Sequence, residues 1–482
     1  MINISKRYGV VILITILSIQ NSFSQTHSRG LDFDDAAYAT APKKAKLTRA
    51  LDVLPAKASI KQFAPYPKTQ DQYGTCAAWA SAYCGRTIVD AIKNNWTDRN
   101  QITKNAYSPA FLFRLLRPDD PACVGGSNIE FAFELMKNKG SIPFTSLPLL
   151  CVPTVAPAQL DMASSAKIKD YARLFDVYSG DNIKVQAVKK SISEKKPVVI
   201  GMLCPPSFDY ARDCWQPTEQ PLTTYGGHAM CIVGYDDEQY GGAFEVQNSW
   251  GTNWGNQGYI WIKYTDMAKF VKYAYEFVDL PDPKPNAPDL SGSLRLSLST
   301  GVDMPVNLLV STRGLKVVAA DKPINKTPEP LTIYQTASTY TSGTNFRIYI
   351  TNDAPAYVYA ISSDLTNAVT KIFPYADGIS AVLNYKKNDV ALPDEDHYIQ
   401  FDNVAGKDFL CVLYSKNELN INDLIAKIGT QTGTFNERVF GALGERMVDP
   451  KNVKFDSDKI KFSGSSADKQ DVVALMVELD HK

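Results

Sequence analysis

A cysteine at the start of a predicted helix, within residues 70–82, most constrains how this chain can fold and act. Thr75 is a suitable N-cap for that helix, and from Cys76 to Ile92 apolar residues recur every three or four positions. The positive end of a helix dipole favours the thiolate, the nucleophilic form of cysteine. The placement of Cys76 therefore suits covalent catalysis, with a buried structural thiol as the alternative for this residue alone.

Only one of the four histidines stands where it can serve Cys76 as a base. His27 adjoins a predicted signal cleavage, His481 is next to last, and His397 lies in the second half of the chain. His228 follows two glycines and opens an apolar strand, so the backbone can pass close to a ligand while the strand holds the ring. A hydrogen-bonded structural histidine is the alternative for this residue alone.

Asn248 follows His228 by twenty positions, in a block that also contains Trp250 and Trp254. Its amide oxygen can accept a hydrogen bond from one ring nitrogen of His228 and leave the other nitrogen to face the thiol. Trp250 can shield that bond from water. A turn-rich loop with structural tryptophans explains each of these residues singly but explains them poorly together.

Residues 70–82, 226–234 and 248–259 together resemble the papain-like cysteine peptidases. The run Cys123-Val124-Gly125-Gly126 is similar to the Cys-x-Gly-Gly turn that lines the substrate cleft in that family. The resemblance covers residues 51–280. It implies an α+β fold with a helical lobe, a β-barrel-like lobe and a cleft between them.

The resemblance also implies roles for single residues. Cys76 would be the nucleophile, His228 the base and then the acid, and Asn248 the residue that orients the imidazole ring. Gln70, six residues before the cysteine, would donate to the oxyanion, and this spacing favours it over Gln72. The cleft residues implied in the same way are Gly125, Gly126, Gly227 and Trp250.

Three features depart from the family pattern. Ala77 follows the cysteine where the family usually has Trp, and Tyr73 replaces a half-cystine three residues before it. Cys123 therefore lacks its usual partner. The region before the domain is too short for the long helical inhibitory propeptide of the family, so activity after export is either unrestrained or restrained by something else.

With 482 residues, the chain is too long for one ordinary core. We divide it into a signal peptide at 1–24, a flexible lead-in or short pro-region at 25–50, the peptidase-like domain at 51–280, a Pro-rich linker at 281–289, and a second domain at 290–482. Lys6 and Arg7 precede an apolar run that is too short to span a bilayer, which is typical of a secretory signal. We expect an exported protein, extracellular or periplasmic, with no membrane span.

Export permits disulfides among the 8 cysteines. If Cys76 is reactive, seven remain, so at least one more is free. Sequence alone does not fix connectivity, but two pairs each bracket a loop-rich stretch and are the preferred bridges: Cys123 with Cys151, and Cys204 with Cys214. Cys231 lies inside an apolar strand and is expected to be a buried thiol.

The second domain shows alternating strands separated by turns, with one helix near residues 421–428, and predicts a mostly-β sandwich or barrel. It weakly resembles a β-rich accessory domain of unknown function found in bacterial multidomain proteins. Four aromatic residues are expected to fill the core, with a face for a protein or glycan partner as the alternative: Tyr357, Tyr359, Phe373 and Tyr375.

The first functional hypothesis is a secreted cysteine peptidase acting on peptides or proteins through a thioester acyl-enzyme. The alternatives are an exopeptidase or acyl-transferring relative with the same triad, and a binding or adhesion protein with a vestigial triad. A formal net charge of zero gives no reason to expect nucleic acid, and we find no metal-ligand spacing and expect no cofactor.

Overall fold

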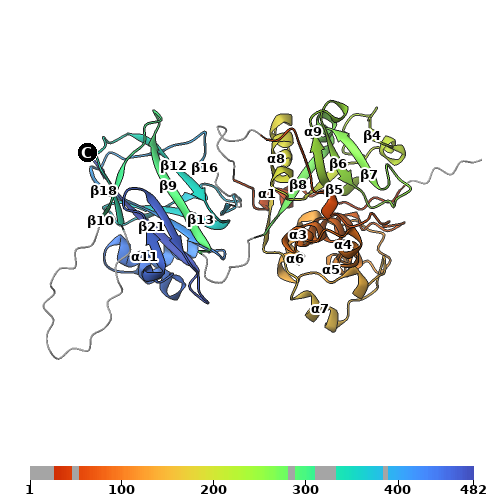
Figure 1. The fold of residues 1–482 in the computed structure, drawn as a ribbon, viewed down its shortest axis with the longest axis horizontal. Coiled ribbons are helices and arrows are strands. Elements are labelled where there is room, and N and C mark those ends of the chain that lie inside the picture. The colour runs from red at the N-terminus through yellow and green to blue at the C-terminus, as the bar shows by residue number, and fades with distance from the viewer. Residues whose placement is uncertain (1–26, 46–53, 280–287, 310–332, 384–388) are drawn as a thin grey trace, which may run out of the picture.

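The computed structural model describes residues 27–45, 54–279, 288–309, 333–383 and 389–482. We refer to residues 27–45 as the N-terminal segment, to 54–279 as the two-lobed region and to 288–482 as the sheet-rich region. Figure 1 shows the two regions beside one another; in the two-lobed region the earlier helices gather on one side, and the strands lie on the other side together with the later helices. The predicted signal peptide and most of the predicted linker lie outside the described residues.

The helical lobe is built from short helices with clear start signals. Ser108 caps α5 and is followed by proline at its first position, and Asn128 caps α6. Helix α6 buries one face with Ile129, Ala132, Phe133 and Met136, whereas α5 is buried continuously from Pro109 to Arg114. The helices of this lobe and its neighbouring turns are η2 (Lys61–Phe63), α2 (Cys76–Ala78), η3 (Trp79–Arg86), α3 (Thr87–Lys93), α4 (Arg99–Lys104), α5 (Pro109–Leu116), α6 (Ile129–Asn138), η4 (Phe144–Ser146) and α7 (Pro157–Ala163).

The other lobe is a sheet with strand order β2-β8-β3-β5-β6-β7-β4, in which β1 also pairs with β5. Its centre is formed by apolar strands, of which β3 and β5 are buried along almost their whole length. Its elements are β1 (Lys57–Ser59), β2 (Asp170–Arg173), α8 (Asp181–Ser193), β3 (Val198–Leu203), η5 (Pro206–Tyr210), β4 (Cys214–Trp215), β5 (Gly227–Asp236), η6 (Gln239–Gly241), β6 (Ala243–Gln247), β7 (Tyr259–Lys263), α9 (Tyr264–Phe270) and β8 (Val271–Val278).

The helix that begins at Cys76 runs through the middle of the two-lobed region. It starts as α2, widens into the π-helical stretch η3 and continues as α3 to Lys93, so the sequence prediction of one helix is confirmed in extent. Every residue of η3 is buried, whereas the spacing predicted a single buried face. Thr75 occupies the N-cap position, but its side chain makes no capping bond within the described residues.

The sheet-rich region has two sheets, ordered β10-β11-β21-β18-β13-β14 and β16-β12-β9-β20-β19, whose facing side chains share one core cluster. Helices α10 and α11 cover the other face of the first sheet, so α11 adds to the one helix predicted there. The elements are β9 (Leu290–Leu298), β10 (Val306–Leu309), β11 (Ile333–Thr336), β12 (Asn345–Asn352), β13 (Ala356–Ser363), β14 (Val369–Phe373), β15 (Val382–Leu383), β16 (Asp389–Leu392), β17 (Ile399–Gln400), β18 (Gly406–Ser415), α10 (Ile421–Thr430), α11 (Phe435–Leu443), η7 (Gly444–Arg446), η8 (Pro450–Asn452), β19 (Val453–Phe455), β20 (Ile460–Gly464) and β21 (Val472–His481).

The N-terminal segment is packed against both regions, where the sequence predicted a flexible lead-in. It contains α1 (Asp35–Thr40), capped by Asp34, and its Tyr38 is buried and stacks on Tyr273 with ring centroids 4.3 Å apart. The Tyr38 hydroxyl donates to the carbonyl of Phe175 at 2.7 Å. The segment is ordered by tertiary contacts on both sides. Its sequence therefore has no periodic pattern that would predict its structure.

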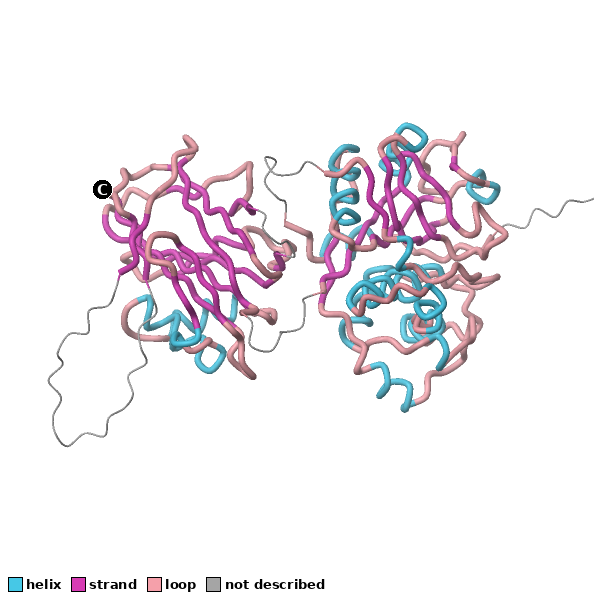
Figure 2. The backbone as a smooth tube through the Cα atoms, in the orientation of Figure 1, coloured by secondary structure: helices cyan, strands magenta, loops and turns pink. Residues whose placement is uncertain are grey.

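Figure 2 shows helices in short lengths and strands running through both regions. Among the described residues, no helix is both long enough and apolar enough to cross a bilayer.

Candidate active site

Cys76 is the first residue of α2 and is fully buried where the helix meets the sheet. Its Sγ accepts a hydrogen bond from the backbone N–H of Ala229, on β5, at 3.4 Å. Ala229 follows His228 directly, so strand β5 both donates an N–H to the sulfur and carries the imidazole on the preceding residue. The helix start and the strand, 152 positions apart in sequence, therefore build one site.

His228 is held on one side by Asn248. Its Nε2 lies 2.7 Å from Asn248 Oδ1, which also accepts the backbone N–H of Ser249 at 2.7 Å. The Nδ1 atom of His228 is buried and has no hydrogen-bond partner among the described residues. The ring of Trp250 stacks on the imidazole with centroids 4.5 Å apart. This arrangement fixes the ring and leaves one nitrogen uncommitted.

Gln70 is buried beside Asn248 and is oriented by two contacts. Ser249 Oγ donates to Gln70 Oε1 at 2.6 Å, and the backbone N–H of Gln70 donates to the carbonyl of Ser249 at 2.8 Å. Because Oε1 is held by Ser249, the amide nitrogen of Gln70 points away from Ser249. Gln70 Nε2 donates to the carbonyls of Tyr73 at 2.8 Å and of Ser28 at 3.1 Å.

The carbonyl of Ser28 brings the N-terminal segment into the site. It accepts a second bond from Trp250 Nε1 at 3.0 Å, and the ring of His27 stacks on Trp250 with centroids 4.6 Å apart. Arg29 anchors the next position through Asp209 at 3.1 Å. The segment thus accepts a bond from Gln70 Nε2, the donor that the family resemblance assigns to an oxyanion.

Two walls bind the backbone of the same segment. On one wall, the N–H of Leu31 donates to the carbonyl of Gly227 at 3.1 Å. On the other, the N–H of Asp32 donates to the carbonyl of Ser127 at 3.1 Å, and the N–H of Ser127 donates to the carbonyl of Gly30 at 2.9 Å. The segment therefore bridges the two lobes as a short strand.

Gly30 lies where no side chain fits. A Cβ at this position would stand 2.1 Å from the carbonyl oxygen of Gly74, which is backbone and cannot move aside easily. A Cβ on Gly126 would likewise stand 2.2 Å from the carboxylate of Asp32. Beyond Asp32 the cleft continues as a hollow of about 590 Å³, lined among others by Phe33, Arg117 and Lys272.

Burial makes the thiol and the imidazole neutral in this conformation. It raises the pKa of Cys76 to about 12, although the backbone N–H groups of Ala229, Ala77 and Gly30 act in the opposite direction. Burial lowers the pKa of His228 to about 3, and the nearby cation Arg29 adds to the lowering while Asn248 opposes it.

Comparison with known proteins identifies the region that holds this site. Residues 67–275 match the family model described as papain family cysteine protease. These residues are a papain-family cysteine peptidase domain. The match includes Gln70, Cys76, His228 and Asn248.

Relatives of the peptidase domain come from distant organisms. A cathepsin L-like proteinase of Fasciola hepatica is 23% identical over 252 residues, covering 49% of this chain and 73% of that protein. Cathepsin K of Gallus gallus is 30% identical over 146 residues, covering 28% and 39%. A peptidase C1-like protein of Acanthamoeba polyphaga mimivirus is 31% identical over 114 residues, and the chain spans only 35% of its length.

Among solved structures, the cysteine protease xylellain from Xylella fastidiosa is similar at 20% identity, with a TM-score of 0.41, over 52% of this chain and 95% of that one. The bromelain protease from Ananas comosus is similar at 20% identity, with a TM-score of 0.38, over 46% of this chain and 99% of that one.

The cysteines of the peptidase domain follow the predictions in part. Cys123 and Cys151 form a disulfide, and Cys231 is a buried free thiol, as predicted. The predicted bridge between Cys204 and Cys214 is wrong, because both are free. Cys204 is buried, with its carbonyl bonded to Arg29 Nε at 3.2 Å, whereas Cys214 lies half-buried on β4.

Some residues of the site carried no sequence signal strong enough to find them. Ser127 rather than Gly125 or Gly126 makes the backbone bonds to the segment. The two glycines instead bind within the domain, where Gly125 N–H donates to Asp120 Oδ2 at 2.7 Å and the Gly126 carbonyl accepts from Arg117. Ser249, which orients Gln70, could by contrast have been found from the sequence, because it belongs to the Asn-Ser-Trp-Gly block.

Proposed function

We propose that this chain is an exported cysteine peptidase that hydrolyses peptide bonds in peptide or protein substrates with Cys76, His228 and Asn248. The bond between His228 Nε2 and Asn248 Oδ1 carries the proposal, because it commits Nε2 and leaves Nδ1 without a partner among the described residues, on the residue next to Ala229, whose N–H bonds Cys76 Sγ. A base with one nitrogen fixed and the other uncommitted is what proton transfer from a thiol requires.

In the proposed reaction, His228 Nδ1 takes the thiol proton and Cys76 Sγ attacks the carbonyl carbon of the scissile peptide. The tetrahedral oxyanion collapses to a thioester as the C–N bond breaks, and the imidazolium gives its proton to the leaving amine. A water molecule, deprotonated by the same nitrogen, then hydrolyses the thioester and restores the thiol.

Gln70 would stabilise the oxyanion through Nε2, together with the backbone N–H of Cys76. Ser249 supports this role because its hydroxyl holds Gln70 Oε1 and so directs the amide nitrogen towards the cleft. The carbonyl of Ser28, bonded to Nε2 at 3.1 Å, stands in for a substrate oxygen in the present conformation.

The present conformation is then a resting state. Cys76 is fully buried and the segment 27–34 lies across the cleft, so a substrate must displace it. Export is proposed from the signal-like residues 1–24, and the Cys123–Cys151 disulfide supports an oxidising compartment. We propose no activity for the sheet-rich region, which as an accessory domain would bind a protein or a glycan.

The variant Gly30→Ala tests the proposal. Its Cβ would overlap the Gly74 backbone, so the segment should leave the cleft and the population of the open state should rise about ten- to hundredfold. We expect faster alkylation of Cys76 by iodoacetamide, followed by mass spectrometry, and faster cleavage of an unfolded protein substrate. Gly180→Ala is the matched control, since a Cβ there meets nothing within 4 Å.

The double variant Gly30→Ala/Cys76→Ala should have no hydrolytic activity. Retained hydrolysis, or alkylation only at other cysteines such as the half-buried Cys214, would refute the peptidase proposal. Peptides with blocked and free ends separate the alternatives: cleavage confined to free ends indicates an exopeptidase, and acyl products with added amines indicate a transferase. An open but inert Cys76 indicates a vestigial site.

A further inference from the structure

We propose that the sheet-rich region stabilises the occluded state of the cleft, because it holds the far end of the N-terminal segment. The inference rests on the proposed function, in which this cleft is the catalytic cleft. The segment lies in the cleft at residues 27–34, passes along the peptidase domain as α1 and reaches the sheet-rich region at residues 42–45.

Lys43 joins the two regions through its backbone. Its N–H donates to the carbonyl of Gly378 at 2.6 Å, and its carbonyl accepts the N–H of Ser380 at 2.8 Å. Its neighbours face the other way: the N–H of Lys44 donates to the carbonyl of Arg173 at 2.9 Å, and the N–H of Arg173 donates to the carbonyl of Pro42 at 2.8 Å. Residues 42–44 are thus an extended strand between the end of β2 and an edge of the sheet-rich region.

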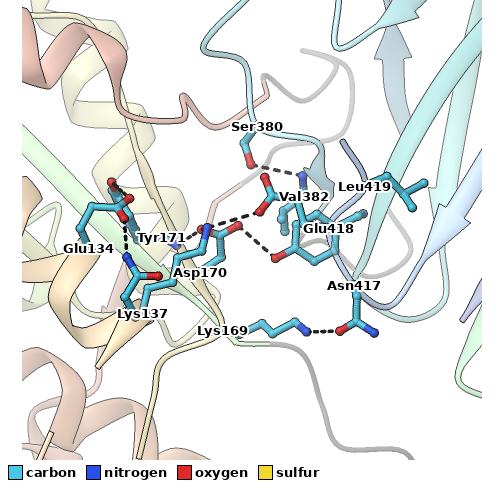
Figure 3. Close-up of polar contacts among 12 residues, drawn as sticks. Glu134, Lys137, Lys169, Asp170, Tyr171, Ser380, Val382, Asn417, Glu418 and Leu419 are labelled. Atoms are coloured by element: carbon cyan, nitrogen blue, oxygen red, sulfur yellow. Dashed lines mark hydrogen bonds and ion pairs between the residues drawn. The ribbon is translucent and has the colours of Figure 1, made fainter. Parts of the chain in front are cut away.

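Ala45 continues this attachment with a side-chain contact. It is buried in the core cluster that the two sheets of the sheet-rich region share. The loop that receives Lys43 also has an internal bond, besides its two bonds to the segment. The Val382 N–H donates to Ser380 Oγ at 3.2 Å, as Figure 3 shows.

The sheet-rich region is itself fixed on the peptidase domain next to this strand. Buried Asp170 accepts from Lys137 Nζ at 2.9 Å and from the Tyr357 hydroxyl at 3.0 Å. Lys169 Nζ donates to Asn417 Oδ1 at 2.6 Å, and Lys137 lies 3.4 Å from Glu418 (Figure 3). With the domain held in place, the edge at 378–380 restrains the position of Lys43 relative to the cleft.

The consequence follows from linkage. Contacts that exist only when the segment is docked lower the free energy of the occluded state. Removing one of them raises the population of the open state by the factor that corresponds to the free energy lost. The segment is tied down both in the cleft and at the sheet-rich region, and loosening the second attachment should loosen the first. The sheet-rich region thereby sets how readily the cleft opens.

Lys43→Pro and Lys43→Ala in the full chain form a matched pair. Both lose the ion pair of Lys43 with Asp176, but only proline also loses the N–H that bonds Gly378. Hydrogen exchange of the amides in residues 27–34, read by mass spectrometry, should be about three- to tenfold faster in Lys43→Pro than in Lys43→Ala. Equal exchange in the two variants would overturn the proposal.

A second pair guards against local misfolding of the proline variant. Ala45→Asp places a charge in the shared core cluster, whereas Ala36→Asp places it at an exposed position of α1. Faster exchange of residues 27–34 in Ala45→Asp alone supports the proposal, and equal exchange in both variants refutes it. Exchange does not depend on Cys76 chemistry, so a Cys76→Ala background separates failure of this inference from failure of the proposed peptidase activity.

Discussion

Gln70 is proposed to serve two states of the same site through one amide. In the occluded state, Nε2 bonds the carbonyl of Ser28, and in catalysis the same atom is proposed to bond the oxyanion. The exposed Gln72, two positions away, has the same side chain without that environment. The difference between these two glutamines lies in Ser249, which holds the Gln70 amide in one orientation.

We predict that Gln70→Ala in the opened Gly30→Ala background lowers kcat about a hundredfold, because one oxyanion donor is lost. Without Gly30→Ala, the same substitution should speed hydrogen exchange of residues 27–34, since Ser28 loses a donor. Steady-state kinetics and exchange measure the two effects. Gln72→Ala is the control, and a larger loss of kcat there would contradict the assignment.

The buried imidazole predicts that acid opens the cleft. His228 has its pKa lowered from 6.5 to about 3 in the occluded state, so that state binds fewer protons than an open state with an ordinary imidazole. Its stability is therefore complete above about pH 6.5 and is lost as the pH falls towards 3. Within that window the open population should rise about tenfold per pH unit.

Other titratable and charged groups near His228 also affect its pKa, so the test must separate their contributions. Arg29 and His27 both lower its pKa, and burial lowers the pKa of His27 as well. Hydrogen exchange of residues 27–34, corrected for the intrinsic effect of pH, should accelerate in acid. His228→Gln should remove most of the dependence, and His27→Gln should leave most of it. The reverse result would place the titration elsewhere.

At the scale of elements, the helix from Cys76 to Lys93 and strand β5 position the site, and loops complete it. The disulfide Cys123–Cys151 closes a loop of 28 residues around one wall of the cleft. The same loop is bonded at its ends, where the N–H of Gly74 donates to the Cys123 carbonyl at 2.8 Å and Arg114 Nε donates to the Val152 carbonyl at 2.7 Å. The bridge therefore supports the turn that carries Ser127.

We predict that Cys151→Ser lowers the free energy of unfolding by about 3 kcal/mol, because the unfolded chain regains the freedom of a loop of this length. Urea denaturation of the full chain measures the change. Cys214→Ser, at a half-buried free thiol, should change the free energy by less than about 0.5 kcal/mol. Equal effects would mean that the bridge adds no stability.

At the scale of the whole molecule, a buried acid joins the two regions. Asp170 lies at the start of β2, and the hydroxyl of Tyr357 on β13 reaches it across the interface. Burial, reinforced by the carboxylate, raises the pKa of Tyr357, so its hydroxyl stays protonated and donates. Tyr357 is therefore an interface and core residue rather than part of an open binding face.

Tyr357→Phe should lower the free energy of unfolding by about 1.5–3 kcal/mol, because the buried carboxylate loses a donor. Tyr398→Phe, at an exposed ring, is the control and should change it by less than about 0.5 kcal/mol. Calorimetry of the full chain measures both. If the two variants unfold alike, the contact between the regions contributes no stability.

Sequence reasoning reached far into the peptidase domain because its signals are local. The spacing from Cys76 to Ile92 predicted a helix that exists. The apolar strand predicted to begin at His228 and to contain Cys231 is β5. The π-helical widening at η3 carried no such signal, since a buried π turn has no spacing of its own.

The sequence alone determined the candidates for the site, because a cysteine at a helix start, the one histidine of four that is placed to serve it, and a following asparagine can be recognised from residue type and spacing. Only the tertiary structure decided that Cys204 and Cys214 stay apart, that Ser127 forms the cleft wall and that residues 27–34 fill the cleft. These outcomes depend on backbone groups meeting across long sequence separations. Every residue type carries the same N–H and C=O, apart from proline, so composition and spacing hold no record of such contacts.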